Sequence, residues 1–314
     1  MNTRRPSRIG GSSRLEREPG RICVVGCLRN ERVRLPSFLA HYRRLGASSF
    51  LLVDNGSDDG SLELLEEQDD VVLYTTEASY AASRFGLDWT TEVANRHAVG
   101  RWVLTVDIDE LIVYPHCEEL DLPRLTSHLE RRRATGLLGF LLDMYSHRPI
   151  AETVLGEGED LLDVCPYHDA DTYSSPRRGP LARVPNRGGP RQRLFWDGRN
   201  LPHPPPFLAK TPLLLWPGGD PYAVSTHQVR ARVRYEGTTC ALLHFKFLAD
   251  FPRAALEEVR RGEHFAGARQ YHAYASRFLE EPALSAYFER SRRYRGSRGL
   301  LDEGLLRADR KLPR

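Results

Sequence analysis

Two hydrophobic periods alternate along the first half of the chain. Short apolar runs typical of buried strands alternate with segments whose apolar residues recur at helical spacing. The predicted strands are 22–25, 50–53, 71–75, a run that begins at Trp102, and 137–142. The predicted helices are 35–45, 62–68, 90–99 and 122–133. This order predicts an α/β fold with a mostly parallel, Rossmann-like sheet flanked by helices.

The pattern changes after Tyr145. More than half of the 21 prolines lie between Pro166 and Pro221, together with many glycines and arginines. We expect this Pro/Gly-rich insertion to lack regular structure, to border the open side of a ligand site and to close over it. Regular patterning resumes at 241–248 and continues into a helical segment at 252–261. The predicted organisation is a disordered tail (1–20), one α/β domain (21–250) and a helical C-terminal extension (251–314).

Composition narrows the class of protein. The chain has 314 residues and a formal net charge of +3, and only three of its 45 basic residues are lysines. This scattered, weak charge argues against a nucleic-acid partner. No apolar run approaches the roughly 20 residues of a membrane span. The five cysteines are odd in number and lie mostly in apolar surroundings, as expected for reduced thiols of a cytoplasmic protein.

The most informative segment follows the fourth predicted strand. Asp107 and Asp109 are two residues apart and Glu110 comes directly after them. Side chains two apart on a strand point to the same side, so the two carboxylates are expected to converge past the carboxyl end of the strand. Two hard oxygen donors in that position suit Mg²⁺ or Mn²⁺. A plain strand-to-loop turn is the alternative interpretation.

A second polar segment follows the strand 50–53. Asp54 begins a stretch that needs a positive-φ turn at Gly56 or Gly60 and offers capping oxygens to the next helix. A nicotinamide fold also places an acid here, but it needs three glycines after the first strand, where this chain has only Gly26. A haloacid-dehalogenase-type phosphatase carries its Asp-x-Asp on the first strand, whereas this chain carries it on the fourth.

Several segments, taken in order, resemble the family 2-like glycosyltransferases of the GT-A fold and the branch related to family 92. The resemblance covers about residues 21–115, and a weaker similarity to a bacterial subgroup continues through 243–247 and 262–264. Its segments are Cys27-Leu28-Arg29-Asn30-Glu31, Phe38-Leu39-Ala40-His41-Tyr42 with Leu45-Gly46, Val53-Asp54-Asn55-Gly56-Ser57-Asp58-Asp59-Gly60-Ser61, and Asp107-Ile108-Asp109-Glu110.

The resemblance implies a GT-A domain over 21–250 and a role for each polar segment. The nucleotide of a sugar donor, with UDP expected, is held by Arg29, Asn30, Glu31 and Asp54, and Asn95 faces the donor. Asp107 and Asp109 bind Mn²⁺ or Mg²⁺ at the diphosphate. The fold commonly adds a histidine from its C-terminal part. His227 and His244 are the candidates, and we prefer His227 because a lone histidine on an apolar strand is more often a core residue.

The implied reaction is a metal-dependent transfer of a sugar to a hydroxyl acceptor such as a glycan. An inverting transfer needs a carboxylate to deprotonate that hydroxyl. Asp143, expected at the end of its strand, is the first candidate, and Asp169 and Asp171 are alternatives. Possible phosphate-binding or sugar-stacking side chains are Arg177, Arg178, Arg187, Arg191, Arg193, Trp196 and Trp216. The alternative function is a non-catalytic nucleotide-sugar-binding or scaffold domain of the same fold.

Overall fold

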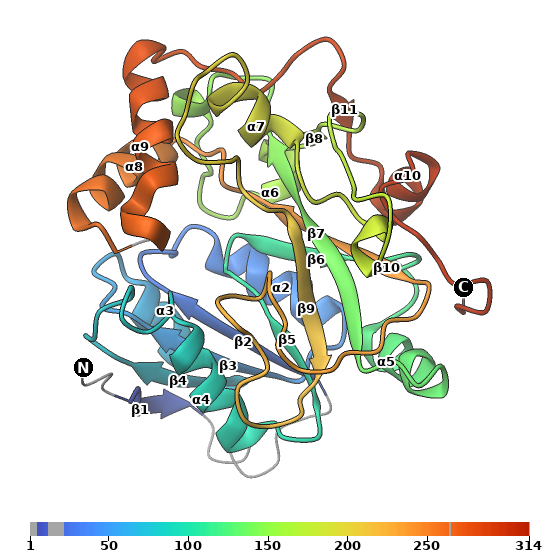
Figure 1. Ribbon diagram of the computed structural model, residues 1–314. Coiled ribbons are helices and arrows are strands. Elements are labelled where there is room, and N and C mark those ends of the chain that lie inside the picture. Colours follow the sequence, from blue (N-terminus) through green and yellow to red (C-terminus); the bar gives the residue numbers. More distant parts are fainter. Residues whose placement is uncertain (1–4, 12–21, 264, 314) are drawn as a thin grey trace.

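A twisted central sheet with helices on both faces forms the core of the molecule (Figure 1). The structure, a computed structural model, describes residues 5–11, 22–263 and 265–313. The strands follow one another across the sheet in the order β1-β4-β3-β2-β5-β9-β7-β10-β6, and β8 and β11 lie off this path. The predicted α/β class is confirmed. The sheet is parallel from β4 to β5 but contains antiparallel pairs at β1 and beyond β5, so it is less parallel than predicted.

The N-terminal half follows the predicted alternation of strands and helices. Parallel pairing joins β4 to β3, β3 to β2 and β2 to β5. The elements are β2 (Ile22–Leu28), α2 (Leu35–Arg44), β3 (Ser49–Asp54), α3 (Ser61–Glu66), β4 (Val71–Thr75), α4 (Leu87–His97) and β5 (Trp102–Thr105).

The expected disordered tail is wrong for one segment. β1 (Ser7–Gly11) pairs antiparallel with β4 and forms an edge of the sheet. Its sequence, SRIGG, lacks the alternating apolar pattern of a half-buried strand, so its place depends on backbone pairing with β4. Residues 1–4 and 12–20 of the predicted tail lie outside the described residues.

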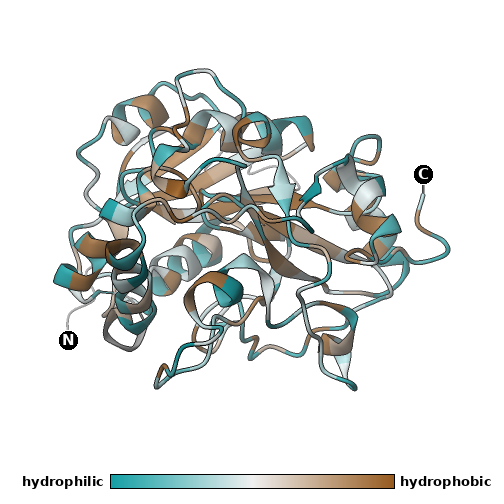
Figure 2. Cartoon of the chain, turned by 90° about the horizontal axis from the view of Figure 1, so that it is seen from above, coloured by the Kyte–Doolittle hydropathy of each residue, from teal (hydrophilic) through white to brown (hydrophobic). Residues whose placement is uncertain are grey.

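Each face of the sheet packs against a different helix. Ile22 and Val24 of β2 belong to one apolar cluster with α2, whereas Cys23 and Val25 belong to a second cluster with α4. This division follows from the alternation of side chains along a strand. Hydrophobic residues concentrate along the central strands and hydrophilic residues along the outer loops and helices (Figure 2).

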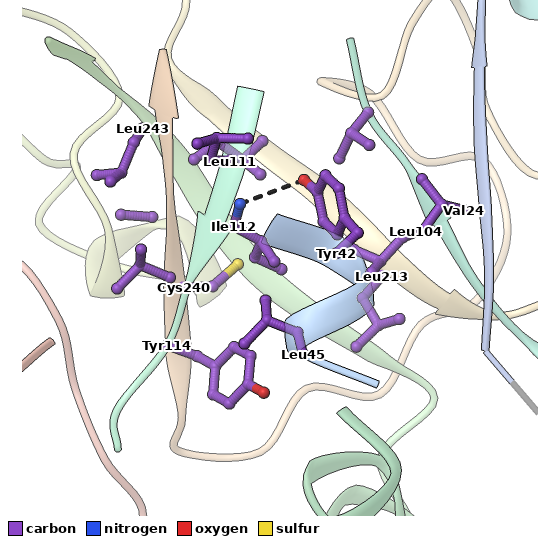
Figure 3. Packing of buried hydrophobic residues seen from close by; sticks show 14 of the residues in the cluster. Val24, Tyr42, Leu45, Leu104, Leu111, Ile112, Tyr114, Leu213, Cys240 and Leu243 are labelled. Atoms are coloured by element: carbon purple, nitrogen blue, oxygen red, sulfur yellow. Dashed lines mark hydrogen bonds between the residues drawn. The ribbon is translucent and has the colours of Figure 1, made fainter. Parts of the chain in front are cut away.

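Side chains of α2 also complete the edge strand β6 (Glu110–Val113), which pairs on its other side with β10 (Thr239–His244). The Tyr42 hydroxyl donates to the Glu110 carbonyl at 2.9 Å and accepts the Ile112 N–H at 3.2 Å (Figure 3). Nε2 of His41 lies 2.8 Å from the Ile112 carbonyl. Unpaired backbone groups at a buried edge are costly, so α2 fixes the start of β6 beside Asp109.

The insertion contributes a central strand, which corrects the expectation that it lacks regular structure. β9 (Ala209–Leu215) lies between β5 and β7 (Gly136–Tyr145) and is antiparallel to both. It contains Pro212, which has no N–H for the ladder, and the pairing with β7 shifts register between Leu137 and Gly139. A proline normally argues against a central strand. β7 also extends past Asp143, which therefore lies within the strand and not at its end.

The remaining elements surround the C-terminal half of the sheet. α8 and α9, orange in Figure 1, pack against each other and lie, with α10, in the predicted C-terminal extension. No described helix is long and apolar enough to cross a membrane. These elements are α5 (Leu122–Arg131), η1 (Ile150–Glu152), α6 (Leu161–Val164), β8 (Tyr167–His168), η2 (Pro180–Arg183), α7 (Gly189–Phe195), α8 (Phe251–Arg261), α9 (Phe265–Glu280), β11 (Arg292–Arg293) and α10 (Gly296–Asp302).

Candidate active site

Six of the described strands point in the same direction and end at one edge of the sheet. β4, β3, β2 and β5 are parallel, and the antiparallel steps into and out of β9 return β7 and β10 to that direction. Open α/β sheets bind ligands in the crevice outside the carboxyl ends of their strands. The polar residues at this edge are Arg29, Asp54, Asp107, Asp143 and His244.

Asp107 and Asp109 lie on the turn between β5 and β6. β5 ends at Thr105, so the strand alternation that predicted their convergence does not apply. The Glu110 N–H donates to the Asp107 carbonyl at 3.1 Å, and the Phe245 N–H donates to the Asp109 carbonyl at 2.8 Å. The Asp107 side chain is 63% exposed and that of Asp109 only 17%. The two carboxylates therefore have different surroundings and, as shown next, different partners.

His244 joins two aspartates at the end of β10. Its Nε2 lies 3.2 Å from Asp109 Oδ2, and its Nδ1 lies 2.6 Å from Asp143 Oδ1. Asp143 is fully buried, and its second oxygen accepts a 2.8 Å hydrogen bond from Arg191 Nε. Because both oxygens of Asp143 are engaged behind the imidazole, this residue is placed to orient His244. Such a carboxylate–histidine pair is typical of metal sites.

The alternating charges of Asp109, His244, Asp143 and Arg191 shift the pKa values of their neighbours. Burial opposes ionisation of His244, but the Asp109 carboxylate outweighs it and raises the pKa of the imidazole above its ordinary value. Burial likewise opposes ionisation of Asp109 and Asp143. The positive charge of His244 holds the pKa of Asp109 well below its usual range, and the guanidinium of Arg191 lowers the pKa of Asp143. The imidazole and the two carboxylates therefore each favour the charged form of their neighbours.

Lys210 of β9 occupies the other side of the turn. Its Nζ donates to Glu110 Oε1 at 2.5 Å and to Asp107 Oδ2 at 3.2 Å, and the side chain is almost completely buried. Although burial opposes the ammonium charge, the Asp107 and Glu110 carboxylates raise the pKa of Lys210 above its ordinary value. Asp107 is thus already paired with a cation of the chain, whereas Asp109 is paired with a potential metal ligand.

The donor set favours His244 over His227 as the histidine of a metal site. One ligand atom each from Asp109, Glu110 and His244 lie within 4.8 Å of one another. One imidazole nitrogen and two carboxylate oxygens suit Mn²⁺ and related divalent cations, so these residues fit the implied metal. His227 lies on the other side of Asp107, and its Nδ1 donates to the Ala209 carbonyl at 2.7 Å. Burial lowers the pKa of His227 to about 3.

Two adjoining cavities open at this edge. The larger, about 280 Å³, is lined by the loop after β2, by Asp107 and Asp109, and by His244. The smaller, about 130 Å³, is lined by the start of α4, by Lys210 and by His227. Both are lined by Cys27, Tyr80 and Asp107, so they meet beside the Asp-x-Asp turn.

The wall opposite the turn comes from the C-terminal helices. Arg253, Glu257 and Arg261 of α8 and Tyr271 of α9 line the larger cavity. The segment after α8 also reaches the β4–α4 loop, because Glu263 Oε2 accepts the Ser79 hydroxyl at 2.6 Å and the Ala81 N–H at 2.8 Å. The helical extension, and not the insertion as a whole, therefore covers this cavity. The insertion supplies Lys210 to the smaller cavity, and the segment that follows it supplies His227.

The loop after β2 is held against the loop after β3. Asn30, at φ 58°, accepts the Asp58 N–H through its side chain at 2.9 Å, and its own N–H donates to Ser57 Oγ at 2.9 Å. Arg29 Nη1 donates to the Asn55 carbonyl at 3.3 Å. Arg29, Asn30 and Glu31 all line the larger cavity. The structure thus brings three of the five predicted nucleotide-binding residues to it.

Asp54 and Asn95 differ in whether their polar atoms are already hydrogen-bonded. Asp54 Oδ2 accepts the N–H groups of Gly56 and Ser57, while Oδ1 is buried without a hydrogen-bond partner among the described residues. A buried carboxylate oxygen of this kind can receive a donor from a ligand. Neither residue lines a cavity, but Asn55, which follows Asp54, lines the larger one. Both ends of the Asn95 amide are occupied: Trp216 Nε1 donates to its Oδ1, and its Nδ2 donates to the Gly219 carbonyl, each at 2.8 Å. We therefore leave Asn95 out of the donor site.

The other sequence candidates have structural partners. Asp169, a possible base, is buried against Arg193 at 3.0 Å, and the exposed Asp171 pairs with Arg290. Trp196 and Trp216 are buried and donate to the His203 carbonyl and to Asn95. Arg187 donates to the Pro205 carbonyl, and Arg177 and Arg178 are exposed.

Sequence reasoning missed Glu110, Lys210 and Lys246. Lys246 lines the larger cavity, and its Nζ donates to the Tyr271 hydroxyl at 3.1 Å and faces the Phe251 ring. Two signals were available: Glu110 directly follows Asp109, and Lys246 and Lys210 are two of only three lysines in the chain. Nothing local in the sequence, however, indicates that Lys210 lies beside Asp107.

Comparisons with known proteins connect this geometry to sugar transfer. No protein-family profile matches the chain. A glycosyltransferase family 92 protein from rice (Oryza sativa subsp. japonica) is similar to it, with 29% identity over 102 residues. The similarity covers 30% of this chain and 16% of the rice protein, so the chain spans only a small part of that relative. This supports a distant relation to a glycosyltransferase.

Proposed function

We propose that this chain is a metal-dependent glycosyltransferase that moves a sugar from a nucleotide-sugar donor, with UDP as the nucleotide, to a hydroxyl acceptor. The observation that carries the proposal is the cluster of Asp109, Glu110 and His244 in a cavity at the carboxyl ends of parallel strands. The distant relation to a glycosyltransferase supports the same class of reaction. The family 92 and GT-A assignments remain part of the proposal.

The donor's nucleotide fits the side of the cavity formed after β2 and β3. Asp54 Oδ1 offers a buried acceptor for an N–H or O–H of the base or ribose. Arg29 lines the same side, and Lys246 lies across the cavity. Burial opposes the charge of Lys246, but the nearby Tyr271 and Asp109 raise the pKa of its ammonium, so it stays cationic and can face a phosphate. A diphosphate between Arg29 and Lys246 would lie beside Asp109.

Mn²⁺ or Mg²⁺ held by Asp109, Glu110 and His244 would neutralise the charge that develops on the departing nucleoside diphosphate. Asp143 contributes indirectly, because it fixes the orientation of His244 from behind. Lys210 pairs with Asp107 and Glu110 and so limits the negative charge of the turn.

The acceptor hydroxyl needs a carboxylate that faces the cavity, a condition that the enclosed Asp143 does not meet. Glu31 lines the cavity. Burial raises the pKa of Glu31 above its usual range, although the neighbouring Arg34 opposes this. A base whose pKa lies closer to neutrality transfers protons more effectively than an ordinary carboxylate. We therefore assign proton removal to Glu31 in place of Asp143.

Calorimetry with UDP, GDP and ADP, each with and without Mn²⁺, tests the proposal. We expect UDP to bind much more tightly with Mn²⁺, and the Asp109→Asn variant to lose that gain. Asp302→Asn is the matched control, because Asp302 lies exposed on α10, where it pairs with Arg298. Release of UDP from UDP-sugars then measures turnover.

The possible outcomes separate the alternatives. Metal-dependent UDP binding with turnover supports the transferase. The same binding without turnover of any UDP-sugar, across a panel of acceptors, indicates a non-catalytic binding domain. If no nucleotide binds more tightly with metal than without it, the proposed metal-dependent donor site is refuted.

A further inference from the structure

A second group of metal-ligating side chains lies away from the two cavities. His128 belongs to the last turns of α5, Glu236 to the loop before β10, and Asp309 to the C-terminal tail after α10. One ligand atom from each residue lies within 4.8 Å of the other two. None of the three lines a cavity of the candidate active site. Three segments distant in sequence thus meet at one point.

The imidazole of His128 is the buried member of this group. The residue is only 2% exposed, and its Nε2 is buried without a hydrogen-bond partner among the described residues. Most buried polar groups in proteins are hydrogen-bonded, so an unpartnered ring nitrogen on a histidine beside two carboxylates needs an explanation. A neutral imidazole nitrogen with a free lone pair is a ready metal ligand.

The two carboxylates are fixed in place but not saturated. Glu236 accepts the N–H groups of Gly237 and Thr238, the latter at 2.9 Å. Asp309 accepts the Lys311 N–H at 2.8 Å and pairs with Arg132 at 3.2 Å. A carboxylate offers about four lone-pair positions, so each still has acceptor capacity. The hydrogen bonds orient each carboxylate but leave lone pairs free to bind a metal ion.

We propose that His128, Glu236 and Asp309 form a structural site for a divalent transition-metal ion of the Zn²⁺ type. One imidazole nitrogen and two carboxylate oxygens are ligands that Zn²⁺ accepts, and water can complete a four-coordinate shell. The imidazole favours Zn²⁺ and its neighbours over Ca²⁺ or Mg²⁺, which prefer oxygen ligands alone. The two carboxylates supply negative charge to a bound cation, while the guanidiniums of Arg131 and Arg132 lie nearby and Arg132 pairs with Asp309.

The ion would fasten the C-terminal tail to the domain. The tail already pairs with the start of β10, since the Thr239 N–H donates to the Arg307 carbonyl at 2.9 Å and the Asp309 N–H donates to Thr238 Oγ1 at 3.2 Å. Leu312 is buried in the main apolar cluster. An ion bound by both Asp309 and His128 of α5 would add a link between the tail and the domain, and would slow the local opening of the tail.

The test uses the full chain, freed of any histidine tag and of metal, and measures bound Zn²⁺ by equilibrium dialysis. We expect His128→Asn and Asp309→Asn each to lose one equivalent of high-affinity Zn²⁺. His244→Asn defines the contribution of the cavity site and should keep that equivalent. His272→Asn is the matched control, because this histidine is exposed on α9. Asp309→Asn, a change in the tail, keeps the test decisive if the buried His128 variant fails to fold.

Hydrogen exchange supplies a readout independent of any activity. In the wild-type chain we expect Zn²⁺ to slow amide exchange across 305–312 and to have no such effect in Asp309→Asn. Folded His128 or Asp309 variants that bind as much Zn²⁺ as the His272 control would overturn the proposal. Unchanged exchange of the tail in the presence of saturating Zn²⁺ would also overturn it. Because neither measurement uses nucleotide or turnover, the result does not depend on the function proposed above.

Discussion

Replacing Asp143 with asparagine separates a positioning role from a catalytic one. The carboxylate touches His244 Nδ1 at 2.6 Å and Arg191 Nε at 2.8 Å and is fully buried. Asparagine keeps the shape and one acceptor oxygen but removes the charge that holds the imidazole in place. If Asp143 acts only by orienting His244, the variant should lose metal affinity, and excess metal should restore transfer.

The structure sets the scale of the two effects. Losing the outer partner of a metal-bound histidine typically weakens metal binding by about 10–100-fold, or about 1.4–2.8 kcal/mol. The variant also leaves the buried guanidinium of Arg191 without its partner, which costs about 3–5 kcal/mol of folding stability. Because total stability is on the order of 5–15 kcal/mol, the measurements belong at low temperature. The double variant Asp143→Asn/Arg191→Gln removes the uncompensated charge and should recover part of that stability.

The assay titrates the protein with Mn²⁺ and measures the free ion by its electron paramagnetic resonance signal. Donor turnover is measured in parallel at limiting and at saturating Mn²⁺. Asp169→Asn is a close control, because Asp169 is also buried and also pairs with an α7 arginine, Arg193. It should lose stability with no change in metal affinity. The reasoning is refuted if Asp143→Asn binds Mn²⁺ as tightly as the wild type. Loss of turnover at every Mn²⁺ concentration, with unchanged affinity, would return Asp143 to the role of base.

Three further predictions follow from the same geometry. Asp109→Asn should weaken Mn²⁺ binding more than Asp107→Asn, because Lys210 already pairs with Asp107; equal Mn²⁺ affinities of the two variants in the same titration would contradict this. Asp54→Ala should weaken UDP binding by about 1–3 kcal/mol, equally with and without metal, as calorimetry can show. Burial lowers the pKa of His41 to about 4 from an ordinary 6.5, so the unfolded chain alone takes up a proton between these values. The free energy of unfolding should therefore fall by about 3 kcal/mol as the pH drops through that range. Chemical denaturation of His41→Gln should show a smaller fall in the free energy of unfolding than that of the wild type. If the two proteins have the same pH profile, His41 is not the source of the effect.

Local sequence patterns determined the N-terminal half of the fold and the location of its site. The strand at 71–75 was predicted with its exact bounds, and the helices at 35–45 and 62–68 to within two residues. These elements follow from periodic apolar positions that each segment carries in itself. The positive φ of Gly56 and Gly60 follows from turn chemistry in the same way. Because parallel strands end at one edge, the polar residues after them had to gather there.

The tertiary structure decided which side chains face one another. His244 lies 101 residues from Asp143, and Lys210 lies 103 residues from Asp107. Such pairs depend on which strands become neighbours. β9 enters the middle of the sheet despite Pro212, because β7 pairs with residues on both sides of the proline and β5 pairs with residues 213–215 after it. Because β9 is antiparallel to both neighbours, the strand direction reverses twice across this part of the sheet. This position of β9 sets Lys210 beside Asp107, and the arrangement makes His244 the histidine that contacts Asp109. Local propensity carries no information about pairing across such distances, so packing alone settles it.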